Sequence, residues 1–238
     1  MLPRFYLQNL KIQNDLVNIS DSQIIHQITK ILRLKIGDVF IVFDAHDEYQ
    51  ILIENVTEDG LAGKIIEKTQ SEREPAKKLI LYQSLLKSDK LEWILQKGVE
   101  IGVTEFTPII SDNSVVREIS KNKLARYEKI IKEATEQCGG LKVASLNQVI
   151  TFKQAVEQTK NSQGQKLLAW EGKKGHELNK ILDSKQREYH LFIGPEGGFS
   201  PEEVALAEQN DLQIVSLGKR ILRAETAAIV ASSLILLS

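Results

Sequence analysis

The chain has 238 residues, of which 42% are hydrophobic and 26% charged, a composition typical of an ordinary globular protein. Its formal net charge of −1 excludes an overall basic field, so a nucleic-acid partner would have to be bound through local patches. The charge is uneven along the chain: residues 1–75 hold 8 basic and 12 acidic residues, whereas residues 76–238 hold 23 and 20.

The sequence favours a cytoplasmic protein. A single cysteine, Cys138, excludes an internal disulfide and is typical of a reducing compartment. Residues 1–10 lack the basic start and apolar core of a signal peptide. The longest apolar run, residues 227–237, is far shorter than the roughly 20 residues needed to span a bilayer. We therefore expect no membrane segment.

The first part of the chain is expected to be mostly β-structure. Three β-type runs, separated by turn residues, cover residues 39–44, 48–56 and 61–68. Before them, Ser20 or Asp21 can cap a helix. Apolar residues recur in that helix at helical spacing, namely Ile24, Ile25, Ile28, Ile31 and Leu32. Short strands with close turns indicate a small barrel.

A polar segment without clear periodicity, residues 69–78, indicates a domain boundary, and we predict domains of residues 1–72 and 73–238. In the second domain strands and helices alternate, which implies an α/β fold with a mainly parallel sheet. The expected strands are 79–85, 106–110, 166–170, 189–193 and 213–217. The expected helices are 90–103, 121–138, one opened by Ser200, and 227–236.

Two loops that follow expected strands carry the chemistry. In residues 192–200, Gly194 and Pro195 force a sharp turn, and the paired glycines 197 and 198 permit close approach of a ligand to the backbone. Ser200, Pro201 and Glu203 then form a helix start. The backbone N–H groups of that first turn could bind hydroxyls or an anion. A strand-to-helix turn without a ligand is the alternative.

The second loop, residues 217–226, is richer in charge. Three cations, Lys219, Arg220 and Arg223, surround the apolar Ile221 and Leu222, and such a pocket can contact phosphate at its rim and a base at its floor. A solvated basic turn is equally compatible with this pattern. The helix that follows is rich in small residues and is a candidate packing or dimer face.

Other functional signals are weaker. Glu171 follows a third expected strand and could reach the same crevice. The four histidines have no metal-ligand spacing, so no metal site is expected. The absence of a G-x-S-x-G motif leaves an esterase-type site without support.

The chain resembles the RsmE-type 16S ribosomal RNA uridine-N3 methyltransferases of the SPOUT superfamily almost from end to end. The most specific matches are the two loops, residues 192–200 and 217–226. Further matches are residues 3–6, His26 with residues 31–33, Gly37 with Asp38, Lys87, Ile94, residues 96–97, residues 100–103 and residues 136–138.

The resemblance implies an N-terminal PUA-like barrel that helps to bind RNA and a SPOUT domain with a trefoil knot. It implies S-adenosylmethionine as cofactor, 16S ribosomal RNA or the small ribosomal subunit as partner, and a homodimer. The expected RNA contacts are Arg4, Arg33, Lys97, Lys219 and Arg220. The expected cofactor-binding residues are Glu171, Ile193, Gly194, Pro195, Glu196, Gly197, Gly198, Leu217, Gly218, Ile221, Leu222, Ala224 and Thr226.

The chain departs from the family outside the two loops. Asn113 and Gly140 stand where the family usually has arginines, Ala144 stands for a proline, and the glycine-rich turn of the barrel is replaced by residues 44–47. The lost arginines remove bidentate phosphate contacts that other residues do not reproduce. The departures concern RNA affinity and target choice rather than the cofactor loops.

Methylation of uracil N3 requires an unpaired or flipped base, because N3 takes part in Watson–Crick pairing. A cation beside a uracil carbonyl would stabilise the anion that develops, and we expect Arg223 to be that catalytic group. Two alternatives stay open: a SPOUT enzyme for another RNA, such as transfer RNA, and a non-catalytic RNA-binding factor of ribosome assembly.

Overall fold

A computed structural model describes the chain except for residues 1, 9, 58–59, 71–72, 173–175 and 238. The chain divides into two compact units, residues 1–74 with 135–143, and residues 75–134 with 144–238. The sequence predicts one boundary between residues 72 and 73, of which residue 72 lies outside the described part. The sequence does not predict that residues 135–143 group with the first unit, because residues 135–138 belong to a helix that begins in the second.

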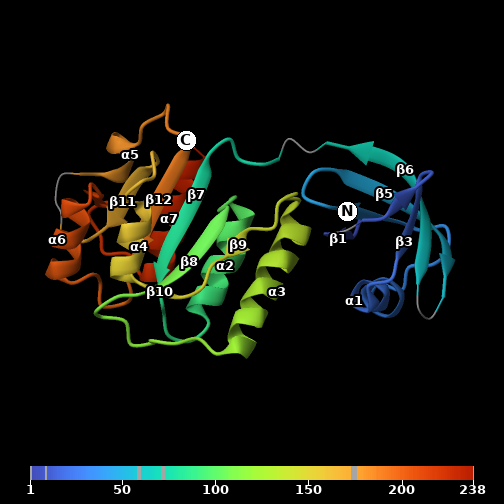
Figure 1. Cartoon of the computed structure of the whole chain (residues 1–238), viewed down its shortest axis with the longest axis horizontal. Coiled ribbons are helices and arrows are strands. Elements are labelled where there is room, and N and C mark those ends of the chain that lie inside the picture. The colour runs from blue at the N-terminus through green and yellow to red at the C-terminus, as the bar shows by residue number, and fades with distance from the viewer. Residues whose placement is uncertain (1, 9, 58–59, 71–72, 173–175, 238) are drawn as a thin grey trace. The chain divides into compact units, whose positions relative to one another are not determined.

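The first unit is built on a six-stranded sheet in the order β1-β4-β5-β6-β3-β2. Strand β1 pairs with β4 in parallel, and the other neighbours are antiparallel. The strands, blue to cyan in Figure 1, are β1 (Arg4–Tyr6), β2 (Ile12–Gln13), β3 (Leu16–Ile19), β4 (Val39–Phe43), β5 (Glu48–Val56) and β6 (Leu61–Thr69). Their buried side chains, such as Phe5, Phe40 and Ile51, form the core of this unit.

The helix of the first unit starts as the sequence predicts. The Asp21 side chain accepts hydrogen bonds from the N–H groups of Gln23 and Ile24, and so caps α1 (Ser22–His26). Ile24, Ile25 and Ile28 are buried. Ile31 and Leu32, which continue the helical spacing in the sequence, are 62% and 44% exposed. The reason is that α1 continues as the π-helix η1 (Gln27–Ile31), whose wider turn changes the spacing of the apolar face.

The second unit contains a parallel sheet, which confirms the predicted α/β class. Its order is β10-β8-β7-β12-β11-β13, with the short β9 also paired to β8. Each of the pairs is parallel. The strands are β7 (Lys78–Ser84), β8 (Glu105–Ile110), β9 (Ser145–Leu146), β10 (Ile150–Thr151), β11 (Gln165–Ala169), β12 (Glu188–Ile193) and β13 (Gln213–Val215).

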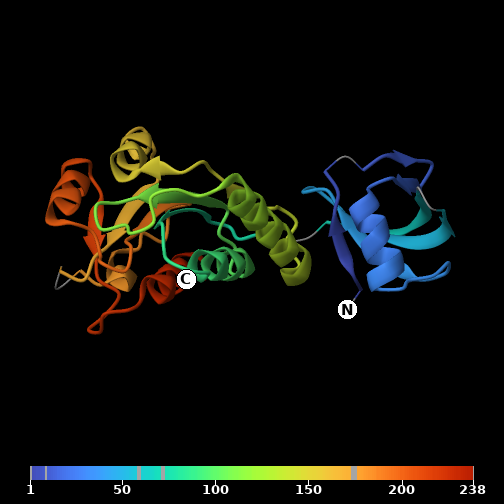
Figure 2. The ribbon, with the colours of Figure 1, turned by 90° about the horizontal axis from the view of Figure 1, so that it is seen from below.

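Helices cover both faces of this sheet. Figure 2 shows α2 (Lys90–Glu100) and α7 (Ala224–Leu236) on one face, and α4 (Phe152–Thr159) and α6 (Pro201–Gln209) on the other. On the face that α4 and α6 cover, buried residues that include Tyr82, Phe192 and Phe199 form a hydrophobic core. The unit also holds the short α5 (Leu178–Ile181) and most of the long α3 (Lys121–Cys138). Among the described residues, no helix has the length and apolarity needed to cross a membrane.

Two helix boundaries differ from the sequence prediction, and the second difference concerns a loop of the site. Helix α2 ends at Glu100 rather than at residue 103, because Gly102 takes a left-handed φ of 95°. Helix α7 begins at Ala224, three residues earlier than expected, with Arg223 as its N-cap residue. The earlier start places Arg223 directly before the first turn of a helix rather than inside a free loop.

Candidate functional site

The two loops singled out by the sequence lie at the carboxyl ends of two strands of the same parallel sheet. Strand β12 ends at Ile193 and β13 at Val215, and β11, which ends at Ala169, lies between them in the sheet. The carboxyl edge of a parallel sheet is where α/β proteins bind ligands. The chain therefore brings three strand ends to one place that can hold a ligand.

Two cavities that share lining residues occupy this place, with volumes of about 350 Å³ and 110 Å³. Ala169, Glu171, Ile221, Leu222 and Ala227 line both of them. The larger one is also lined by Lys90, Ile193, Gly194, Pro195, Glu196, Gly198, Arg223 and Ala224. The smaller one is also lined by Trp170, Ser216, Leu217, Gly218, Lys219 and Arg220.

The lining includes most of the residues that the sequence proposes for the cofactor. The exceptions are Gly197 and Thr226, which line neither cavity. Five lining residues are not predicted from the sequence, namely Ala169, Trp170, Ser216, Ala227 and Lys90. The first four lie inside expected strands and an expected helix and carry no distinctive pattern, and Lys90 lies on a helix that is remote in sequence.

The geometry of the first loop depends on Gly198. This residue has a left-handed φ of 70°, and a Cβ atom here would lie 2.7 Å from Oε1 of Glu171. The loop is closed by the N–H of Gly198, which donates to the carbonyl of Pro195 at 3.0 Å. A side chain at residue 198 would therefore strain the backbone and displace Glu171 from the cavity wall.

The helix start after this loop has the form that the sequence predicts. Ser200 and Glu203 form a capping box, with Pro201 in the first turn of α6. The Glu203 carboxylate accepts the N–H groups of Ser200 and Asp112, each at 3.0 Å. Burial raises the pKa of Glu203, against the lowering effect of these two N–H donors.

A small ion-pair group forms part of the wall of the larger cavity. The Nζ atom of Lys90 lies 2.9 Å from Oε1 of Glu196 and 3.8 Å from Oε2 of Glu225. Burial alone would raise the pKa of Glu196, but hydrogen bonds from Lys90 and from backbone N–H groups outweigh it and hold that pKa below its ordinary value. Glu196 is therefore an ionised acceptor that is already paired with Lys90.

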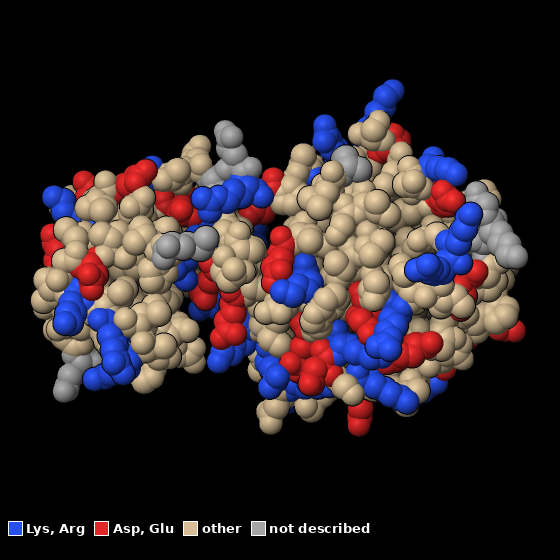
Figure 3. All heavy atoms as spheres, turned by 180° about the vertical axis from the view of Figure 1, so that it is seen from behind, with Lys and Arg blue, Asp and Glu red and all other residues tan. Residues whose placement is uncertain are grey.

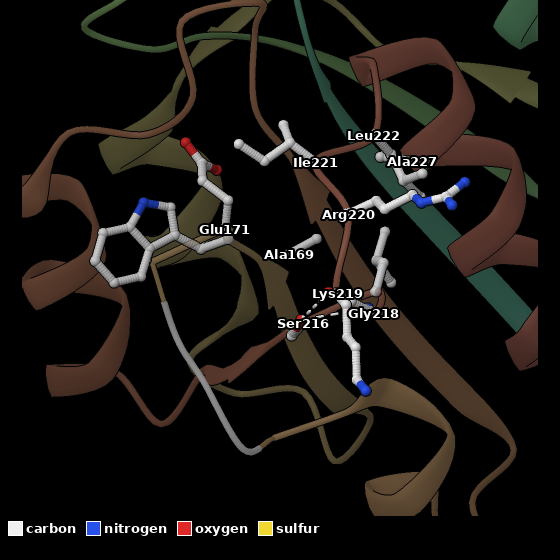
Figure 4. Close-up of a pocket in the computed structure, with 11 residues that line it drawn as sticks. Ala169, Glu171, Ser216, Gly218, Lys219, Arg220, Ile221, Leu222 and Ala227 are labelled. Carbon is white, nitrogen blue, oxygen red and sulfur yellow. Dashed lines mark hydrogen bonds between the residues drawn. The ribbon is translucent and has the colours of Figure 1, made fainter.

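The second loop presents cations around an apolar floor. Gly218 has a φ of 118°, and its N–H donates to the hydroxyl of Ser216 at 3.3 Å, which fixes the start of the loop. Figure 4 shows Glu171 and Ile221 extending toward each other over Ala169, whereas Lys219 and Arg220 extend in other directions. Ile221 is 83% exposed, which leaves an apolar surface open at the cavity.

Arg4, which the sequence places among the RNA contacts, is buried inside the first unit. Its five N–H donors bond Glu48 and the backbone carbonyls of Thr135, Glu136 and Gly140. Arg4 is only 7% exposed, and all the donors of its guanidinium are engaged, so it is not available to a phosphate. We therefore assign Arg4 a structural role instead of an RNA contact.

The other expected RNA contacts lie at or near the surface. Arg33 is exposed and takes a left-handed φ of 57°. Lys97 pairs with Glu100 at 2.6 Å on α2. Lys219 and Arg220 are exposed beside the smaller cavity. On the face that Figure 3 shows, basic and acidic side chains are interspersed, consistent with local patches rather than one basic field.

The comparisons with known proteins identify the family of this chain. Residues 72–236 match the family model described as RNA methyltransferase domain. A protein named ribosomal RNA small subunit methyltransferase E, from Mesomycoplasma hyopneumoniae, is 40% identical over 70% of this chain and 72% of its own length. The protein of that name from Bacillus subtilis is 34% identical over 89% of this chain and 86% of its own length.

Solved structures have the same fold over nearly the whole chain. The ribosomal RNA small subunit methyltransferase E of Neisseria gonorrhoeae, bound to S-adenosyl methionine, gives a TM-score of 0.89 at 27% identity and covers 98% of this chain and 95% of that one. A putative methyltransferase of Legionella pneumophila in complex with the same cofactor gives 0.87 at 29% identity, with 99% and 97% covered. The chain therefore belongs to the RNA methyltransferase domain family, and to the RsmE-type group that its sequence resembles.

Proposed function

We propose that this protein transfers a methyl group from S-adenosylmethionine to N3 of a uridine in 16S ribosomal RNA of the small subunit. The observation that carries the proposal is the double cavity at the carboxyl ends of β11, β12 and β13, lined by both family loops. The relatives from M. hyopneumoniae and B. subtilis are named small-subunit ribosomal RNA methyltransferases, and two structural neighbours hold the cofactor.

The residues present fit the cofactor. The backbone at Gly194 and Gly198 permits close approach, and a Cβ atom at Gly198 would crowd the wall. The side chains of Ile221 and Leu222 supply an apolar surface, and Glu171 a hydrogen-bond acceptor. When bound there, S-adenosylmethionine would supply an electrophilic methyl group. The chain's own part is to hold and orient the two reactants and to exclude water.

Arg223 is our candidate for the catalytic cation. It lines the larger cavity, and within the described part of the chain its guanidinium forms no hydrogen bond or ion pair. A guanidinium that is not engaged elsewhere can donate to a uracil carbonyl and stabilise the anion left when the N3 proton departs. We assign Lys219 and Arg220, at the rim of the smaller cavity, to RNA phosphates, with Arg33 and Lys97 as further contacts.

Three finer features belong to the same proposal. Helix α7 follows the edge strand β13 but packs against β7 and β12 in the middle of the sheet and against α2, a return path that supports a trefoil knot. The mainly antiparallel sheet of the first unit, with α1 and η1 on its core, supports a PUA-like RNA-binding barrel.

A homodimer is the third feature. Helices α2 and α7 pack against each other and expose large apolar side chains, Trp93 at 44%, Val230 at 36% and Leu234 at 37%. Exposed apolar groups on two adjacent helices favour a protein interface. Light scattering on the purified protein should give twice the mass of 26.8 kDa for one chain, and a monomer would contradict the dimer.

The test of the proposed function is to incubate the purified protein with labelled S-adenosylmethionine and small ribosomal subunits from cells that lack the enzyme. Nucleoside mass spectrometry should then identify 3-methyluridine in 16S ribosomal RNA. Free 16S RNA and transfer RNA serve as parallel substrates. Label in transfer RNA alone would favour a different RNA target, and cofactor binding without any transfer would favour a non-catalytic assembly factor.

A further inference from the structure

The loop that follows β8 lies against the glycine loop of the larger cavity. Asp112 connects the two: its N–H donates to Glu203, and its carboxylate accepts the hydroxyl of Ser200 at 2.7 Å. Its own loop is held in shape by Ser111 and Ser114, whose hydroxyls lie 2.9 Å apart and are both buried. The turn formed by residues 111–114 is therefore hydrogen-bonded to the start of α6.

Asn113 makes the contact with the glycines themselves. Its amide nitrogen Nδ2 donates to the carbonyl oxygens of Gly197 at 3.2 Å and of Gly198 at 3.1 Å. A Cβ atom at Gly197 would lie 3.1 Å from Cβ of Asn113, so the two segments touch as well as bond. Only the nitrogen of this amide can donate, so the contact requires a hydrogen-bond donor at residue 113.

The glycine loop needs such support at residues 197 and 198, which have no side chains to hold them. Glycines have the greatest backbone freedom, and Gly197 and Gly198 are adjacent. The loop lines the larger cavity through residues 194–196 and Gly198, whereas Asn113 lines neither cavity at the strand ends. Any effect of Asn113 on a ligand in the cavity must therefore act through the loop.

We propose that Asn113 is a positioning residue, which holds Gly197 and Gly198 in the conformation that binds the cofactor. The inference rests on the proposed function, since it takes S-adenosylmethionine to be the ligand of the larger cavity. The side-chain amide of Asn113 acts on the cofactor through its two hydrogen bonds to this loop.

Calorimetry with S-adenosylmethionine tests the proposal through two variants of Asn113, only one of which keeps the shape of the side chain. Asn113→Ala removes both the donors and the side-chain packing, whereas Asn113→Asp keeps the shape and replaces the donors by a negative charge. We expect the Kd to rise about threefold to tenfold for Asn113→Ala, the range for one or two neutral hydrogen bonds. For Asn113→Asp we expect a rise at least as large, because a carboxylate facing two carbonyls repels them.

The matched control is Asn210→Ala. Asn210 lies at the other end of α6, and its Nδ2 also donates to a backbone carbonyl, that of Leu206 at 2.8 Å. Its loss should leave the cofactor Kd unchanged. The melting temperature of the free protein should stay within a few degrees for both Asn113 variants, since the contact is exposed. Wild-type affinity in Asn113→Asp would overturn the proposal.

Hydrogen exchange of the free protein keeps this inference separate from the proposed function. Peptides that cover residues 194–200 should exchange faster in both Asn113 variants than in Asn210→Ala, since the loop opens more often without its donors. Unchanged exchange would contradict the role of Asn113 even if the protein binds the cofactor. Failure of the wild-type protein to bind S-adenosylmethionine would instead contradict the proposed function, while faster exchange would still support the role in the loop.

Discussion

The guanidinium of Arg4 lies 2.6 Å from the carboxylate of Glu48, and both side chains are largely buried. The same guanidinium donates to carbonyls at the end of α3 and in the turn after it, including that of Gly140. Its face also lies 4.5 Å from the ring of Phe43. Arg4 thus joins the sheet of the first unit to residues 135–143, the segment that groups with it.

We expect Arg4→Ala to destabilise the protein by about 3 kcal/mol, because it leaves the Glu48 carboxylate without its partner in a buried position. The free energy of unfolding from urea titration measures this. Arg33→Ala, which changes an exposed arginine of the same unit, should alter stability by less than about 0.5 kcal/mol. Equal stability of the two variants would contradict the structural role of Arg4.

Gly198→Ala should lower the affinity for S-adenosylmethionine at least about tenfold, or 1.4 kcal/mol. The new Cβ would lie 2.7 Å from Glu171 in a backbone with a φ of 70°, so the wall of the cavity must move. Gly37→Ala is the control, because Gly37 also has a positive φ, of 93°, but has open space around its Cβ position. It should cost stability through strain and leave the cofactor affinity unchanged, as calorimetry can measure.

The sequence predicts the parts of the site that depend on local conformation. Glycines, a first-turn proline and a capping pair are contiguous between Gly194 and Glu203, so their pattern specifies a turn and a helix start without knowledge of the rest of the fold. The class of sheet follows equally from the alternation of strand and helix patterns. The cofactor and substrate classes follow only from the resemblance to a family, because the periodicity of apolar residues does not indicate them.

Contacts between residues far apart in the sequence could not be predicted in this way. The bonds of Asn113 to Gly197 and of Lys90 to Glu196 each join residues that are more than 80 positions apart. The sequence favours a surface position for Arg4, because no residue close to it in the sequence indicates that Glu48 is its partner. The exposure of Ile31 and Leu32 could not be predicted for a different reason. A π-helix changes the number of residues per turn, on which the helical spacing of apolar residues depends.

His190 should make stability depend on pH. Burial lowers its pKa from 6.5, although Glu188 raises it, and Lys78 and Lys166 oppose protonation further. Its Nε2 lies 2.7 Å from the Ser162 hydroxyl, and its Nδ1 lies 3.4 Å from the Tyr82 hydroxyl. Because the unfolded chain binds the proton more readily, the stability contributed by neutral His190 is present above about pH 6.5 and is lost as the pH falls.

Urea titrations between about pH 8 and pH 5 measure that dependence. The free energy of unfolding of the wild-type protein should fall toward the acid end, and His190→Gln should flatten the curve. His26→Gln, at an exposed histidine, should keep the wild-type slope. A slope that is the same in wild type and His190→Gln would assign the pH dependence to other groups.

Arg223→Ala should separate cofactor binding from methyl transfer. The backbone carbonyl of Arg223 accepts the N–H of Ala227 at 2.8 Å, and its side chain does not cap α7, so the helix start survives the change. We expect the Kd for S-adenosylmethionine to stay near the wild-type value while kcat falls at least about tenfold, or 1.4 kcal/mol of transition-state stabilisation. Arg220→Ala, which removes a neighbouring cation assigned to RNA, should instead raise the KM for RNA. Wild-type turnover in Arg223→Ala would remove this residue from the mechanism.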